Sequence, residues 1–297
     1  MARGKIGTPI ERPTEWWLQA LRQRAERMYE EQLDWSQPIE FVSETEREGC
    51  IRFFNAAYRA EESGKAQALA LAEEVRAWDP ELSECLTLYG NEEGWHRELL
   101  TEFLGRIGGG VRPMGRMTGT LYRLYGRAKS METIMLTNLM FETIGSTTYR
   151  LALRNVRQPT VRQLLQILTR DESFHVPLNV HFIRQVLKRQ TRRWGQAKLQ
   201  TIYHAVFLAL IGSAYKSRKA AQSFDQLSFR ELATAYVENL GRLFLSESDL
   251  DFRPLAPVLW AFGLSSQGLR QEGGPAAISV AAAAAAARRE EVAVTVL

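Results

Sequence analysis

Two motifs of the same form, Glu-x-x-His, lie in two different stretches of this 297-residue sequence. Glu93 and His96 form the first motif, and Glu172 and His175 form the second. A spacing of three residues places both side chains on one face of a helix, about one turn apart. A carboxylate oxygen and an imidazole nitrogen can then reach one metal ion from the same side, and such mixed ligation suits iron or manganese.

Each motif also has an acidic residue about 30 residues upstream, where an antiparallel partner helix would pass the same level. Glu62 lies 31 residues before Glu93, and Glu142 lies 30 residues before Glu172. Glu142 stands in the apolar stretch 135–145, where an unpaired carboxylate is costly. The sequence therefore predicts six metal ligands in two half-sites: Glu62, Glu93, His96, Glu142, Glu172 and His175.

Glu61 is the alternative to Glu62 as the first ligand. The helical face through Ile51, Phe54 and Tyr58 favours Glu62, so Glu62 is preferred and Glu61 stays open. A solvated helix bundle with chance acids is the alternative to a metal site as a whole. The apolar surroundings of the fourth predicted ligand argue against that alternative.

The elements that must position these residues are helices. Apolar residues recur at helical spacing along most of the chain, and few segments show the period of two typical of strands, so the expected class is all-α. Short turns join two pairs of long helices, and a long crossover separates the pairs, which is the topology of a ferritin-like four-helix bundle. We expect helices near 14–33, 43–78, 80–106, 130–156, 160–190, 196–217 and 228–246, with a partly helical crossover around 117–126.

These helices divide the chain into four regions. Residues 1–42 form an N-terminal extension with a lead-in helix, and residues 43–190 form the four-helix bundle. Additional C-terminal helices pack on the bundle over 191–267. The Gly- and Ala-rich tail, 268–297, is expected to be flexible.

The predicted ligands and their order resemble those of the ferritin-like di-iron carboxylate superfamily, over the predicted bundle. This group includes rubrerythrins, the ribonucleotide reductase small subunit, bacterial multicomponent monooxygenases, acyl-carrier-protein desaturases and arylamine N-oxygenases. The resemblance implies that Glu93 and Glu172 bridge two iron ions. The other ligands would bind one iron each: Glu62 with His96, and Glu142 with His175.

The resemblance also points to residues behind the ligands. In several members an aspartate in the place of Asp171 accepts a hydrogen bond from the histidine of the other hairpin, here His96. Glu92 occupies the equivalent place for His175, with an exposed acid as the alternative. Ser146 matches a hydroxyl that oxygenating relatives often carry, although a hydroxyl bonded to its own helix backbone is an equal alternative. We therefore expect Ser146 and Asp171 to contribute to catalysis.

The function expected from this site is that of a non-haem di-iron oxidase or oxygenase. It would activate O2 at two bound iron ions, with manganese as the alternative metal, and oxidise a small organic or carrier-bound substrate. Hydroxylation, desaturation and N-oxygenation all stay open. A rubrerythrin-like ferroxidase or peroxide scavenger and a non-catalytic metal-binding scaffold are the other hypotheses. An external electron donor is expected, and a homodimer stays open.

Composition narrows the setting. A net charge of +4 is too weak to indicate nucleic-acid binding. Cys50 and Cys85 form no disulfide framework, which favours a reducing, cytoplasmic protein. The apolar run 205–214 is too short to cross a membrane. We interpret the basic stretches 112–129 and 187–193 as solvated faces or loops. The alternative is a site for an acidic substrate or carrier protein.

Overall fold

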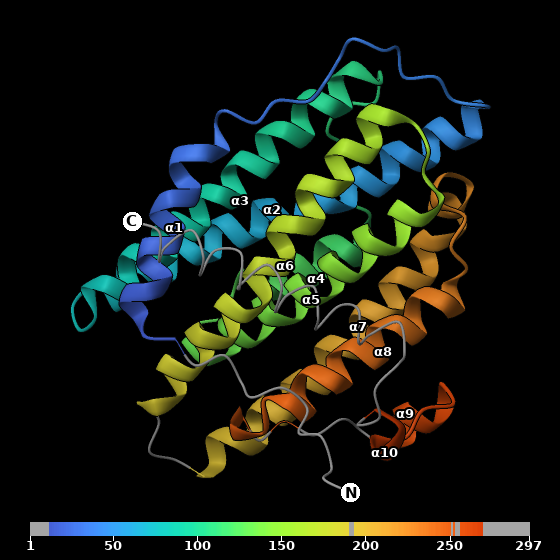
Figure 1. Ribbon diagram of the computed structural model, residues 1–297. Coiled ribbons are helices and arrows are strands. Elements are labelled where there is room, and N and C mark those ends of the chain that lie inside the picture. Colours follow the sequence, from blue (N-terminus) through green and yellow to red (C-terminus); the bar gives the residue numbers. More distant parts are fainter. Residues whose placement is uncertain (1–11, 190–192, 251, 253–255, 270–297) are drawn as a thin grey trace, which may run out of the picture.

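The computed structural model describes residues 12–189, 193–250, 252 and 256–269. Within these ranges every regular element is helical, so the all-α prediction is confirmed (Figure 1). Most of the tail that was expected to be flexible, from residue 270 onward, lies outside the described residues. In the described part, no helix combines the length and the apolarity that a membrane span requires.

Four long helices form the centre of the molecule. The first two pack as an antiparallel hairpin joined by residues 76–79, and the other two as a hairpin joined by residues 156–158. The hairpins also contact each other, because α2 packs on α5 and α3 packs on α6. The four helices are α2 (Glu44–Val75), α3 (Pro80–Arg106), α5 (Met131–Asn155) and α6 (Pro159–Lys188).

Local sequence signals fix where three of these helices begin. The side chains of Ser43, Asp79 and Gln158 each accept a hydrogen bond from a backbone N–H in the first turn of the helix that follows. Pro80 and Pro159 stand at the first helical position, where a missing N–H costs no helical hydrogen bond. These caps hold the register of each hairpin, and the register decides which side chains meet at the centre.

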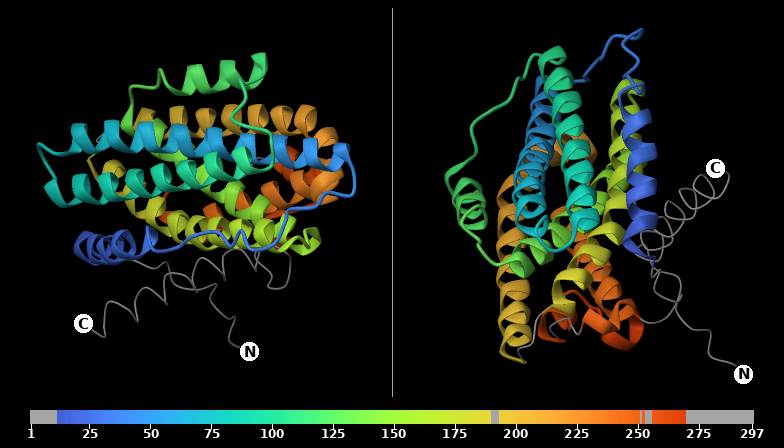
Figure 2. Two further views of the ribbon diagram at one scale, coloured as in Figure 1. Left: turned by 90° about the horizontal axis from the view of Figure 1, so that it is seen from above. Right: turned by 90° about the vertical axis from the view of Figure 1, so that its left-hand side faces the viewer.

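The remaining helices surround this centre. Helix α1 (Thr14–Met28) packs against α3, and it ends earlier than the expected residue 33. The crossover between the hairpins carries α4 (Arg116–Tyr125), which lies outside the bundle (Figure 2). Helix α7 (Arg193–Asp225) packs on α2 and α5, and α8 (Phe229–Ser246) packs on α5 and α7.

Helix α7 is longer than the expected 196–217. It continues through Gly212 and ends before Gln226, whose φ of 59° is a left-handed conformation that stops the helix. Three short elements follow α8: a 3-10 turn (Ser248–Leu250), α9 (Ala256–Ala261) and α10 (Ser266–Leu269). The sequence pattern did not predict these three.

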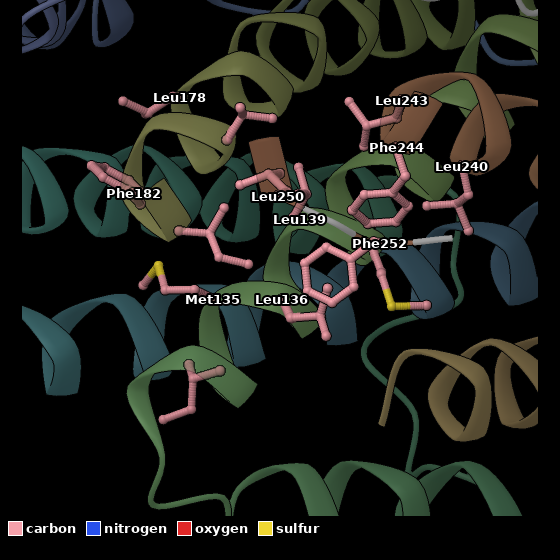
Figure 3. Close-up of a cluster of buried hydrophobic side chains, with 14 of the residues drawn as sticks. Met135, Leu136, Leu139, Leu178, Phe182, Leu240, Leu243, Phe244, Leu250 and Phe252 are labelled. Atoms are coloured by element: carbon pink, nitrogen blue, oxygen red, sulfur yellow. The ribbon is translucent and has the colours of Figure 1, made fainter. Parts of the chain in front are cut away.

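Two apolar clusters fill the interior, one on each side of the middle of the bundle. The first includes Phe174 and Phe182 together with Phe244 and Phe252, and Figure 3 shows the last three beside leucines and Met135 of the neighbouring helices. The second cluster gathers around Phe54 and extends along the C-terminal half of α3. Buried acids and histidines occupy the level between the two clusters.

Candidate metal centre

Six buried side chains converge at the middle of the bundle, and we call them the Glu/His cluster. None is more than 6% exposed, and they come from α2, α3, α5 and α6. They form two overlapping groups, each with its potential ligand atoms within 4.8 Å of one another. Glu93 and Glu172 belong to both groups, as carboxylates that bridge two ions would. The Glu/His cluster consists of Glu61, Glu93, His96, Glu142, Glu172 and His175.

The first predicted ligand requires a correction. Glu62 is not part of the cluster, because its side chain is 40% exposed and pairs with Arg59 at 2.6 Å. Glu61 takes the expected place, and its Oε2 lies 3.4 Å from Nδ1 of His96. The other five predicted ligands, on α3, α5 and α6, are brought together.

The helical register of α2 explains this difference. The prediction followed the helix face from Phe54 through Tyr58 to Glu62. In the structure the buried stripe instead runs through Phe54, Ala57 and Glu61, whereas Tyr58 is only partly buried. Because Glu61 follows Phe54 by seven residues, two helical turns, it faces the bundle interior and its neighbour Glu62 does not.

Both cluster histidines turn Nδ1 toward the carboxylates. Nδ1 of His175 lies 3.1 Å from Oε1 of Glu93 and 3.5 Å from Oε2 of both Glu142 and Glu172. Ligands about 2.0–2.2 Å from a transition-metal ion, when they stand at right angles, are about 3 Å apart. The observed spacings therefore match nitrogen and oxygen atoms that share an ion.

The opposite nitrogens of these histidines face a second layer of acids. Nε2 of His96 lies 3.2 Å from Oδ2 of Asp171, and Nε2 of His175 lies 3.3 Å from Oε2 of Glu92. These are the two pairs that the sequence suggested. Arg24 of α1 donates to both carboxylates, at 2.7 Å to Asp171. One buried guanidinium therefore links the outer partners of both histidines.

Several atoms of the cluster are buried without a hydrogen-bond partner. They are Oε1 of Glu93, Oε2 of Glu142, Nδ1 of both His96 and His175, and Nε2 of His175. Their short mutual distances do not meet hydrogen-bond geometry, so the polar atoms of the cluster do not satisfy one another. Buried polar atoms are almost always satisfied in proteins, and a metal ion is a direct way to satisfy this set.

A small cavity, which we call the inner cavity, lies beside the carboxylates of the cluster. Its volume is about 20 Å³, enough for an object about the size of one water molecule. Its polar lining consists of the four cluster carboxylates, Asn138 and Tyr149, and Phe141 closes one side. Hard or borderline cations fit this oxygen-rich surface better than soft ones.

The electrostatics of the metal-free cluster also fit a cation site. Burial raises the pKa of Glu93 and of Glu172 well above the ordinary value, and neighbouring carboxylates raise it further. Burial also opposes ionisation of Glu61, but contacts with Glu93 and His96 hold its pKa at about 2. For His96, burial is outweighed by Asp171 and Glu61, and its pKa rises to about 10. Protons thus compensate the buried charge, and two divalent cations would match the four carboxylates.

Glu61 and Glu142 each belong to only one of the two groups, and we call them the terminal glutamates. Each accepts a hydrogen bond from a tyrosine of the opposite hairpin. Tyr89 of α3 donates to Glu142, and Tyr149 of α5 donates to Glu61 at 3.4 Å. The sequence pattern did not identify Tyr149. It also missed Arg24, although a signal exists: Arg24 lies on the same helical face as the apolar Trp17, Leu21 and Met28 of α1.

Ser146, the predicted catalytic hydroxyl, packs between two helices. It is 2% exposed, and its Oγ lies 3.3 Å from Oγ of Ser173 in α6. The inner cavity is lined from α5 by other residues, among them Asn138 and Gly145. Ser146 therefore contacts the residue that follows Glu172 and does not line the inner cavity. Its part in catalysis stays a prediction.

The two other histidines lie outside the cluster. Nε2 of His181 contacts Oγ1 of Thr14 at 3.2 Å, and burial lowers the pKa of His181 to about 4. His204 lies on α7 beside Gln200. Neither belongs to the groups of acids and histidines that could hold a metal among the described residues.

Comparison with known proteins adds no family to this picture. No protein-family model, curated protein or solved structure matches the chain. The structure itself establishes a mostly helical protein with a buried Glu/His cluster whose arrangement could hold metal.

Proposed function

We propose that this protein is a non-haem di-iron oxidase or oxygenase on a ferritin-like bundle. One observation carries the proposal: four carboxylates and two imidazole Nδ1 atoms converge, buried and largely unsatisfied, at the centre of two helical hairpins. Two antiparallel hairpins joined by a crossover are the bundle topology in which di-iron carboxylate sites occur. Mixed carboxylate and imidazole ligation suits iron, and manganese is the alternative.

In this proposal each ligand has a defined task. Glu61 and His96 would hold one ion, Glu142 and His175 would hold the other, and the two carboxylates common to both groups would contact both ions. When bound, a pair of ferrous ions supplies electrons for the reduction of O2, which permits oxidation of an organic substrate. An external donor is then needed to return the electrons.

The second layer keeps the ligands in the state that metal binding requires. Nε2–H of His96 donates to Asp171, and Nε2 of His175 lies 3.3 Å from the carboxylate of Glu92. A proton on each Nε2 would leave Nδ1 of both histidines free to bind an ion. Arg24 compensates the charge of both acids and holds them in place. The apolar clusters above and below keep water away, which strengthens every electrostatic interaction at the centre.

Iron binding and reaction with O2 test the proposal together. Metal-free protein would be loaded anaerobically with ferrous iron, the bound iron counted per chain, and the sample mixed with O2 while its visible spectrum is recorded. A paired His96→Ala, His175→Ala variant removes both imidazole ligands. His204→Ala is the matched control, because His204 lies outside the cluster.

We expect two iron ions per chain and a rapid, oxygen-dependent absorbance change in the native protein and the control. Both should be lost in the paired variant. Continued oxidation of excess iron with growth of a mineral would favour a ferroxidase. Absence of specific iron binding would contradict the metal centre itself.

A further inference from the structure

A second, much larger pocket lies beside the metal centre, and we call it the outer pocket. Its volume is about 1040 Å³, at the top of the roughly 300–1,000 Å³ range of small-molecule sites. Helices α2, α4, α5 and α7 provide most of its wall. The crossover lines one side of this space with residues 112–115 and with side chains of α4. Figure 2 shows α4 on the outside of the bundle.

Most of the pocket wall is apolar. From α7 it receives Ala205, Val206, Ala209 and Leu210, and α5 contributes Ile144 together with aromatic and threonine side chains. A wall of this kind binds an apolar molecule through the area that it removes from water. The lining follows α5 from Thr133 to Ile144, a length of about 16 Å of helix. A space of this size and length suits an extended chain or a row of rings rather than a small polar solute.

One aromatic side chain separates the outer pocket from the inner cavity. Phe141 lines both spaces. Tyr122 of α4 stacks on it with ring centroids 5.9 Å apart, and Tyr125 meets it edge-on at 5.5 Å. The hydroxyl of Tyr125 also donates to Asn138, which lines the inner cavity. Among the described residues Phe141 alone belongs to both linings, and the crossover contacts it.

The charged residues in the lining are all arginines: Arg52, Arg59 and Arg112, which we call the rim arginines. Arg52 and Arg112 share one carboxylate, that of Glu48, whereas Arg59 pairs with Glu62. Three guanidiniums therefore face two carboxylates, which leaves one positive charge in excess. In addition, Nε of Arg59 is buried without a hydrogen-bond partner.

We infer that the outer pocket binds an elongated apolar molecule that carries one carboxylate-like anionic group. The apolar part lies along α5 and α7 toward Phe141, and the anionic group lies at the rim arginines. Bidentate pairing with a guanidinium favours a planar carboxylate. The inference rests on the proposed function for its purpose, since the ligand would be the substrate that Phe141 admits to the metal centre, but binding itself needs no metal.

Calorimetric titration of the metal-free, full-length protein tests this inference. The probes are octanoate and decanoate, with 1-decanol as the uncharged match. Ala209→Trp fills the pocket from α7, and Leu208→Trp is its control, because Leu208 is the next residue, is 59% exposed and does not line the pocket. Arg112→Gln removes the excess charge and leaves Glu48 its second partner, Arg52.

We expect decanoate to bind more tightly than octanoate by roughly fourfold per added methylene. It should also bind at least about tenfold more tightly than decanol. Ala209→Trp should abolish binding and Leu208→Trp should not, with both variants showing native circular dichroism. Arg112→Gln should weaken binding of decanoate and leave that of decanol unchanged.

Equal affinity for decanoate and decanol, no dependence on chain length, or undisturbed binding in Ala209→Trp would overturn the inference. Failure here is separable from failure of the proposed function. Two bound irons that react with O2 in a protein that binds no decanoate would overturn the pocket assignment alone. Decanoate binding in a protein that takes up no iron would support the pocket and contradict the metal centre.

Discussion

The two hairpins build the same half-site from different helices. The α2–α3 half offers Glu61 with Glu93 and His96, and the α5–α6 half offers an equivalent set. In each half the terminal glutamate accepts from a tyrosine of the other hairpin, and the histidine meets an acid of the other hairpin. Each half is therefore completed by its partner, which explains why neither hairpin would form the centre alone.

The halves differ in what lies around them. Asp171, which contacts the histidine of the α2–α3 half, accepts hydrogen bonds from both Arg24 and Arg170, the latter at 2.7 Å. Of these two arginines, only Arg24 donates to Glu92. Beside the terminal glutamate of the α5–α6 half stands Phe141, which borders the outer pocket. The arrangement of the cluster is nearly symmetric, whereas only one half adjoins the outer pocket. The proposal therefore predicts that metal binding and substrate access can be altered separately.

The largest effect is expected from the first ligand. Glu61→Ala should remove one terminal carboxylate and weaken metal binding by more than the roughly 10–100-fold typical of outer partners. Glu62→Ala is the matched control, because that side chain is 40% exposed and pairs with Arg59. Counting iron after dialysis against a weak chelator separates the two. Iron loss in Glu62→Ala with retention in Glu61→Ala would restore the sequence-based assignment.

The next effect is expected from the residue that joins the halves. Arg24→Met leaves two buried carboxylates without their shared cation, which should cost about 3–5 kcal/mol in the free energy of unfolding. Arg22 lies on the same helix as Arg24, and Arg22→Met removes an exposed ion pair with Glu84 of α3, which should cost less than about 1 kcal/mol. Urea unfolding of the metal-free proteins measures both. An equal loss of unfolding free energy in the two variants would show that Arg24 stabilises the protein no more than an exposed arginine does.

A smaller and unequal effect is expected from the acids behind the histidines. Asp171→Asn and Glu92→Gln should each lower the affinity of one metal ion by roughly 10–100-fold. The loss should be larger for Asp171, which is fully buried and accepts from two arginines as well as from His96. Competition with a coloured chelator gives the two affinities. A larger loss for Glu92→Gln would reverse the proposed asymmetry.

The smallest effect concerns two glycines at matching positions, each three residues after a terminal glutamate. A Cβ at Gly64 would lie 3.1 Å from Oε2 of Glu93, whereas at Gly145 its nearest neighbour would be a carbon of Tyr149 at 3.7 Å. Gly145→Ala should stabilise α5 by up to about 1 kcal/mol and leave metal binding unchanged. Gly64→Ala should weaken metal binding a few-fold, because Glu93 must move. Identical metal affinities in the two variants would contradict this difference.

Much of the centre follows from the sequence because helical spacing is local. The two Glu-x-x-His motifs, and the isolated Glu142 in an apolar stretch, locate three helices of the centre within a few residues. The sequence-based preference for Glu62 over Glu61 was wrong because the apolar face of this helix is wide enough in the sequence pattern to include either residue. The repeated form Glu-x-x-Gly, at 61–64 and again at 142–145, is a signal in the sequence that would have favoured Glu61.

Other features could not be predicted because they depend on how distant elements pack. Arg24 meets Glu92 and Asp171 only after α1 docks beside α3. The outer pocket arises where the crossover lies over α2, α5 and α7, and no periodic pattern encodes that space. One residue of the basic stretch 112–129, Arg112, lines the outer pocket as one of the rim arginines.

A crystal structure of the protein loaded anaerobically with ferrous iron, with anomalous scattering recorded at the iron edge, tests the central claim most directly. We predict two iron peaks between α2, α3, α5 and α6, with Glu93 and Glu172 touching both. Glu61 and His96 should complete one site, and Glu142 and His175 the other. A single peak, peaks away from these residues, or Glu62 in place of Glu61 would contradict the account.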